Sequence, residues 1–209
     1  MIHTANSVRT LQAVAMTLGL AVFLWSTGLP TLFHFAEAAS ITGASDTLSS
    51  SASSSLSNHT IAFTTPSGML ASSTITITFP AQFTIPAMAF DDIDITASGT
   101  DKTVAGVSGT SGVWGAYFSG QVLTLTSPTD VSQASSTPFV IEIGTNATFG
   151  ATGDAQITNP AATTSYAIDI AGSMPDSGQV RVAIVDQVTV SASVDTSLTF
   201  TVSGVGASS

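Results

Sequence analysis

Alternation of apolar and polar residues dominates the middle of the chain. Residues 73–83 place Ile75, Ile77 and Phe79 on one side, with threonines between them. A period of two residues predicts a β-strand with one face in the core and the other in water. Pro80 then ends the strand, because proline has no N–H to donate to a neighbouring strand.

The same alternation recurs along most of the chain. Residues 83–90 contain Pro86 and are expected to cross between sheets. Ser119-Gly120 lies between two strand-like runs, which predicts a β-hairpin. Many short strands joined by turns predict an all-β fold, an antiparallel immunoglobulin-like β-sandwich. Further strands are predicted at residues 59–65, 93–96, 112–119, 121–126, 138–143, 166–170 and 180–184.

The first 38 residues predict a secretory signal-peptide helix. Residues 10–36 contain no charged side chain and are mostly apolar. Ala36 and Ala38 place small residues at the two positions that signal peptidase reads, so cleavage is expected after Ala38 or Ala39. The alternative is an uncleaved membrane anchor, because the uncharged run is long enough to span a bilayer. Either reading places the remaining chain outside the cell or at its surface.

The rest of the sequence divides into three parts. Residues 39–57 are rich in serine and lack periodicity, which predicts a flexible linker. A ragged edge strand near Leu48 is the alternative. Residues 58–186 form the predicted sandwich domain. Residues 187–209 alternate again and are expected to be extra strands. The start of a second, truncated module is favoured, because 197–201 echo 60–64. The alternatives are strands that dock on the first sandwich or that add to a neighbour's open edge.

Charge is scarce and mostly negative. Of 209 residues, 3 are Lys or Arg and 13 are Asp or Glu, which gives a formal net charge of −10. Such a chain has too few cations to displace counterions from phosphates, which argues against nucleic acid as a partner. Anionic lipid is disfavoured for the same reason, so contact with a membrane is expected only through an uncleaved leader. The chain has no cysteine, which excludes disulfides and thiolate metal sites.

Several strings within residues 58–204 resemble a module of large secreted proteins from uncultivated, small-genome bacteria of the candidate-phyla type. They include TITITFPAQF, VIEIGTNAT and AQITNPAATTSYAIDIAG. The resemblance implies an immunoglobulin-like module of a surface protein, with a structural role outside the cell. It supplies no catalytic residue.

Four aspartates form the candidate metal site. Asp91, Asp92 and Asp94 cluster at the start of a strand, and Asp101 follows the next turn. Carboxylate oxygens are the ligands that Ca²⁺ prefers, so calcium is the cofactor that this group would hold. The alternative is a solvated strand end whose charges prevent pairing with another chain.

Other candidate chemistry is sparse. A Ser-His-Asp hydrolase would need His59, and the chain has no Gly-x-Ser-x-Gly turn to supply its serine. A sugar-binding face would draw on Trp114, Tyr117 and Tyr166. Trp114 is expected in the core instead, because tryptophan is highly buried on average. We therefore predict that the protein is not an enzyme.

These observations favour a non-enzymatic extracellular or cell-surface structural module, such as a spacer, a stalk or a surface-layer component. The alternative is an adhesin or a carbohydrate-binding module, assisted by calcium. The expected partners are other surface proteins or cell-wall glycans. An exposed aromatic platform would favour the binding role, and a uniformly hydroxylated surface would favour the structural role.

Overall fold

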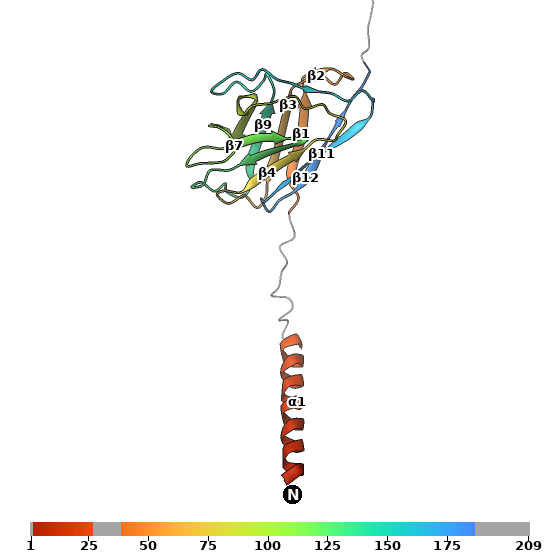
Figure 1. The fold of residues 1–209 in the computed structure, drawn as a ribbon, viewed down its shortest axis with the longest axis vertical. Helices are drawn as coiled ribbons and strands as arrows, with labels where there is room; N and C mark the ends of the chain where they lie inside the picture. The colour runs from red at the N-terminus through yellow and green to blue at the C-terminus, as the bar shows by residue number, and fades with distance from the viewer. Residues whose placement is uncertain (1, 27–38, 187–209) are drawn as a thin grey trace, which may run out of the picture.

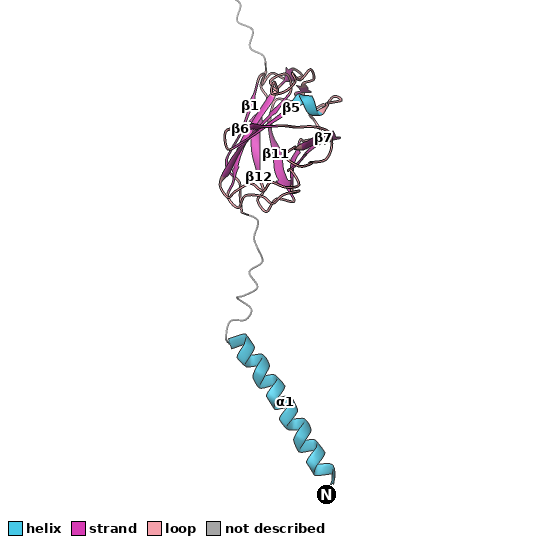
Figure 2. Ribbon diagram, turned by 90° about the vertical axis from the view of Figure 1, so that its left-hand side faces the viewer, coloured by secondary structure: helices cyan, strands magenta, loops and turns pink. Residues whose placement is uncertain are grey.

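The computed structural model describes residues 2–26 and 39–186 (Figure 1). Helix α1 (Ile2–Ser26) lies in the leader. No helix among the described residues is both long enough and apolar enough to cross a membrane. Residues 39–186 form an antiparallel β-sandwich (Figure 2). The prediction of an all-β sandwich after an N-terminal helix is confirmed, whereas the predicted cleavage motif at 36–38 and the tail 187–209 lie outside the described residues.

The sandwich has two five-stranded sheets and one small ladder. Its elements are β1 (Thr42–Leu48), β2 (Leu56–Ser57), β3 (His59–Thr65), β4 (Thr74–Thr78), the 3-10 helix η2 (Phe90–Asp92), β5 (Ile93–Ala97), β6 (Thr100–Lys102), β7 (Gly115–Ser119), β8 (Val122–Thr126), β9 (Thr137–Ile143), β10 (Ile157–Thr158), β11 (Ser165–Gly172) and β12 (Gly178–Ala183). The first sheet has the order β1-β3-β9-β5-β6, and the second has the order β12-β11-β4-β8-β7. The ladder pairs β10 with β2.

Strand β4 shows why the alternating pattern is informative. It lies between β11 and β8 in the second sheet, so its inner face meets the first sheet. Ile75 and Ile77 are fully buried, while the threonines between them stay partly exposed. Burial of each such side chain contributes roughly 1.5–3 kcal/mol. Phe79 follows the strand and is also buried, so the predicted inward face is confirmed.

Aromatic rings fill part of the core between the sheets. Trp114 is 1% exposed and meets Phe139 edge to face, with ring centroids 5.9 Å apart. Phe63 stacks on Phe139 at 5.6 Å. Such pairs add roughly 0.5–1.5 kcal/mol beyond the burial of their surface. The predicted core position of Trp114 is confirmed.

Two predictions about connections are also confirmed. Strands β7 and β8 form a hairpin whose last pair is Ser119 with Val122. Gly120 has a φ of +58° in the turn, a conformation that costs glycine little. Residues 83–90 lead from β4 in the second sheet to β5 in the first, which is the predicted crossing.

The prediction of a flexible linker at residues 39–57 is wrong. Strand β1 pairs with β3 at the edge of the first sheet, and β2 pairs with β10. Strand pairing uses backbone N–H and C=O groups, so a serine-rich segment without apolar alternation can still join a sheet edge. The alternative of an edge strand near Leu48 is confirmed, and the sandwich begins near residue 40 instead of residue 58.

Hydrogen bonds between the two sheets partly close both lateral sides of the sandwich. Beside β1 and β12, Ile41 N–H donates to the Ser177 carbonyl at 3.0 Å. Beside β6 and β7, Trp114 N–H donates to the Thr103 carbonyl at 2.9 Å. Bonded edges leave fewer free backbone groups that could pair with another chain.

The chain comes into the sandwich at one end and leaves it at the opposite end (Figure 1). Parallel bridges join Ser40 to Ser177 near the first end and Ala52 to Val185 near the second. Position 185 lies eight steps along the chain from position 177. An extended chain rises about 3.3 Å per residue, so the two bridges lie up to about 26 Å apart.

Candidate functional site

The predicted aspartates lie where β9 passes into the loop of residues 144–155. Asp92 ends η2 and is 1% exposed. Its Oδ1 accepts the N–H groups of Asp154 and Ala155 at 2.8 and 2.9 Å. Its Oδ2 accepts the N–H of Ala89 at 2.9 Å. This one carboxylate therefore joins the end of the loop to the segment before β5.

Asp94 holds the tip of the same loop. Asp94 is 7% exposed, and its Oδ2 accepts the N–H groups of Thr148 and Phe149, both at 2.6 Å. Hydrogen bonds to an ionised acceptor are shorter and stronger than bonds between neutral groups. The other oxygen, Oδ1, accepts no hydrogen bond from a described residue.

The structure does not assemble the four aspartates into a calcium site. Asp91 is exposed, and the Oδ1 of Asp101 accepts the hydroxyl of Thr96 at 2.8 Å. Within residues 2–26 and 39–186, no group of three or more His, Asp or Glu side chains is placed to hold a metal ion. Asp92 and Asp94 instead accept N–H groups of the loop, because buried backbone donors need acceptors.

Glu142 adds negative charge next to this loop. It lies opposite Asp94 in the ladder between β9 and β5. Burial raises the pKa of Glu142 above its ordinary value, and the charges of Asp94 and Asp101 raise it further. Carboxylates on three neighbouring strands therefore gather on the outer face of the first sheet.

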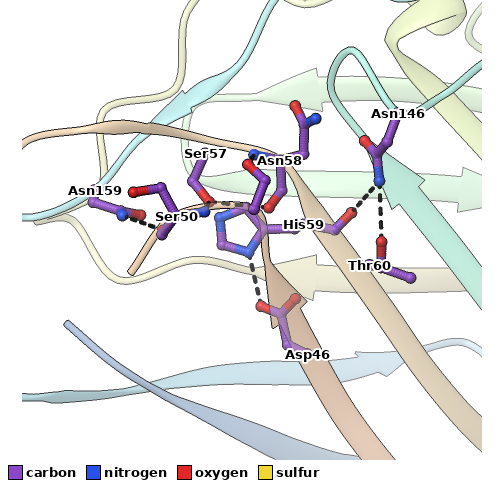
Figure 3. A network of polar contacts seen from close by, with 9 residues as sticks. Asp46, Ser50, Ser57, Asn58, His59, Thr60, Asn146 and Asn159 are labelled. Carbon is purple, nitrogen blue, oxygen red and sulfur yellow. Dashed lines mark hydrogen bonds and ion pairs between the residues drawn. The ribbon is translucent and has the colours of Figure 1, made fainter. Parts of the chain in front are cut away.

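A buried polar pair, Asp46 and His59, joins β1 to β3 (Figure 3). His59 Nδ1 lies 2.7 Å from Asp46 Oδ2, and both side chains are fully buried. The imidazole meets the rings of Phe79 and Phe83 at centroid distances of 5.2 and 5.9 Å. His59 Nε2 and Asp46 Oδ1 have no hydrogen-bond partner among the described residues. The bond between the two side chains explains how an edge strand can carry an inward carboxylate.

The surroundings of His59 are those of a packed polar layer (Figure 3). The hydroxyl of Ser57 donates to the Asn58 carbonyl at 3.0 Å and accepts the N–H of Ser50 at 3.2 Å. Asn159 Nδ2 donates to the Ser50 carbonyl at 2.8 Å. Because His59 is fully buried, its ring is closed to a substrate in this arrangement.

The aromatic residues are arranged differently from a sugar-binding platform. Trp114 and Tyr166 are buried, and the Tyr166 hydroxyl donates to a backbone carbonyl at 3.0 Å. Tyr117 is half-buried on β7. Phe90 and Phe149 are exposed instead, by 43% and 48%. The sequence does not single out these two rings, because a lone phenylalanine beside a loop has no periodic pattern that assigns it to a face.

Phe90 and Phe149 border a hollow of about 390 Å³. Its walls come from η2, the start of β5, the residues that follow β6 and the tip of the 144–155 loop. Most of the lining is apolar, and Asp91 and Asp94 contribute the carboxylates. A hollow of this size accepts a small molecule or a protruding side chain.

No protein-family model and no curated protein sequence matches the chain. Among solved structures, the chain is similar to BslA, described as a bacterial hydrophobin, with a TM-score of 0.39 and 14% sequence identity. The aligned region covers 69% of this chain and 96% of the BslA chain. A similarity of this size supports no statement about function.

Proposed function

We propose that the protein is a non-enzymatic structural module of the extracellular space or the cell surface, working as a spacer, a stalk or a surface-layer component. The observation that carries this proposal is the course of the chain, which comes in at one end of the sandwich and leaves at the other (Figure 1). A domain with this course adds its own length to the polypeptide, whereas a domain whose ends meet adds little.

The outer faces of the sheets support the same role. Thr74, Thr76 and Thr78 alternate with the buried residues of β4, and Thr76 lies opposite Thr124 of β8. Hydroxyl groups keep such a surface hydrated without charge. The bonded lateral sides add protection, because they limit pairing between neighbouring molecules.

The leader supports a location outside the cell. Its uncharged apolar run and small residues before position 39 are the features of a secretory signal. The resemblance of residues 58–204 to surface modules of candidate-phyla-type bacteria supports the same location. Other surface proteins or cell-wall glycans are the partners that this location provides.

Export is tested by producing the full chain, with an epitope tag after Ser209, in a bacterial host. We expect antibody to label intact cells and N-terminal sequencing to find a mature chain that begins at Ala39 or Ser40. A variant with both Ala38→Lys and Ala39→Lys is the control, because a large charged residue directly before either cleaved bond blocks signal peptidase. Labelling that requires cell lysis, with Met1 retained on the unmodified chain, would contradict the proposed location.

The spacer role is tested by measuring distances between spin labels in the full chain. The chain has no cysteine, so a Ser40→Cys and Asp186→Cys pair carries the only two labels. We expect this pair to be separated by about 25–30 Å, as the extended course between the ends requires. The control pair at Ser40 and Ser177 should be much closer, since a bridge joins these residues. Equal distances for the two pairs would refute the proposed course.

One observation supports the alternative role, that of an adhesin or a carbohydrate-binding module. Phe90 and Phe149 present exposed rings at one end of the sandwich, where sugar rings could stack. A glycan-binding screen with the unmodified protein and a Phe149→Ala variant tests it. Binding that disappears in the variant would favour the alternative role.

A further inference from the structure

The hollow bordered by Phe90 and Phe149 combines aromatic walls with carboxylates. Its lining includes Asp91 and Asp94 but no Lys, Arg, His, Asn or Gln side chain from the described residues. An ionised carboxylate only accepts hydrogen bonds. Apart from Thr103, the polar side chains of the lining are therefore acceptors, which favours a ligand with hydrogen-bond donors and an apolar part that covers the rings.

Asp94 is the residue that points to a ligand. It is 7% exposed, and both hydrogen bonds from the loop go to its Oδ2. Its Oδ1 receives no hydrogen bond from the described part of the chain. Asp94 also lines the hollow, so this oxygen is available to a ligand there. Asp94 Oδ1 is not among the fully buried atoms that lack a partner, so it keeps contact with solvent and can accept a charged donor placed in the hollow.

The charge around the hollow is unbalanced. Glu142 lies next to Asp94 in the ladder, and the raised pKa of Glu142 reflects burial and the neighbouring negative charges. Lys102 lies one residue before the lining residue Thr103, yet it forms no ion pair with a described residue. The local field therefore favours a cation over a neutral or an anionic ligand.

Both phenylalanines line the hollow, so a cation bound there would lie near their rings. The N–H of Phe149 donates to Asp94, so the carboxylate also fixes the start of this side chain. Phe90 is the first residue of η2 and also lines the hollow. A cation over the face of an aromatic ring is attracted by the ring electrons, and this attraction grows as water is excluded.

We propose that this hollow binds a primary ammonium group carried on an apolar chain. The ammonium donates to Asp91 and Asp94, and the apolar chain lies against Phe90 and Phe149. The volume of about 390 Å³ accepts an amine of several carbons. A free alkylamine and the lysine side chain of another protein share this chemistry. The proposal does not depend on the structural role of the domain.

Calorimetric titration of the full 209-residue chain with hexylammonium tests the proposal. Hexanol is the matched control, because it has the same apolar chain without the charge. We expect hexylammonium to bind at least about tenfold more tightly than hexanol, and its affinity to fall as salt is added. Equal binding of the two compounds, or no binding of hexylammonium, would overturn the proposal.

A second arm distinguishes the two sources of the amine. Nα-acetyl-lysine amide carries the lysine side chain with both backbone ends blocked. Binding comparable to that of hexylammonium assigns the hollow to lysine side chains, and binding of hexylammonium alone assigns it to free amines. Either result supports the shared ammonium chemistry.

Variants locate the binding in this hollow. Asp91→Asn removes a charge at an exposed residue that accepts no hydrogen bond in the described chain, so we expect about tenfold weaker binding and an unchanged fold. Phe149→Ala should weaken binding through loss of the ring. Asp169→Asn, at an exposed site on β11 of the other sheet, is the matched control and should have no effect. Equal losses in the two aspartate variants would show a response to net charge alone and refute the site.

Discussion

Replacing Asp92 by alanine should cost about 3–6 kcal/mol of unfolding free energy. The carboxylate accepts three backbone N–H groups, those of Ala89, Asp154 and Ala155, at 2.8–2.9 Å. A buried donor that loses its acceptor costs about 1–3 kcal/mol, and entering water offsets part of that cost. Taking about 1–2 kcal/mol for each of the three donors gives this range, which is a large share of a typical total of about 5–15 kcal/mol.

Two further substitutions at the same place separate the hydrogen bonds from the charge. Asp92→Asn keeps one oxygen for Asp154 and Ala155 but turns an NH₂ group toward the N–H of Ala89. We expect this variant to lose about 1–3 kcal/mol, the cost of one unsatisfied donor. Asp91→Ala is the control, because this exposed neighbour accepts no hydrogen bond from a described residue, and its loss should stay within about 0.5 kcal/mol.

Urea unfolding followed by circular dichroism measures these losses, and native-state hydrogen exchange reports the individual amides. The amides of Asp154 and Ala155 should exchange faster in Asp92→Ala than in the unmodified protein. A calcium chelator should leave the unfolding midpoint unchanged, because N–H groups occupy the carboxylate. A loss under about 1 kcal/mol with both amides still protected would refute the bracing role. A lower midpoint in chelator would restore the metal hypothesis.

The remaining predictions concern the core, the outer face and the tail. Trp114→Ala should cost about 3–5 kcal/mol in urea unfolding, whereas Tyr117→Ala should cost under about 1 kcal/mol, and similar losses would contradict the burial of Trp114. Because the pKa of Glu142 is raised, the folded state holds its proton more tightly, so stability should fall as pH rises above the ordinary value of 4.5. Glu142→Gln should flatten that decline, and an unchanged pH profile would exclude this cause. A chain that ends at Asp186 should unfold at nearly the same urea concentration as the full chain; if it does not fold, residues 187–209 belong to the first core.

The sequence predicts the inner strands well because their burial leaves a pattern. Strands such as β4 and β9 must present apolar side chains on the face that meets the core. This requirement produces the alternation of apolar and polar residues in the sequence. Strand β1 has no such requirement, since an edge strand pairs through its backbone. Its inward residues include Asp46 as well as Leu48, and the partner of Asp46, His59, lies 13 positions away. No sequence pattern links Asp46 to His59. The sequence alone therefore does not decide between a linker and an edge strand at residues 42–48.

The candidate site shows a similar limit. The sequence places Asp92 and Asp94 together correctly, but it cannot say what their oxygens accept. That choice depends on the path of the 144–155 loop, whose donors lie 54–63 positions further along the chain. The exposure of Phe90 and Phe149 depends on the same path. Residue type therefore predicts the position of the acidic group, and tertiary structure decides between metal binding and loop bracing.

Both ends of the sandwich use scarce carboxylates as backbone acceptors. At the end opposite Asp92 and Asp94, Asp176 accepts the N–H of Ser67 at 2.8 Å. In a chain without disulfides, such bonds help to hold long loops in place. Asp91 differs from these aspartates, because it accepts no backbone N–H group from a described residue. It is exposed and lines the hollow. Since the fold does not need its charge, substitution of Asp91 can separate binding of an ammonium group from stability, whereas substitution of Asp94 changes both.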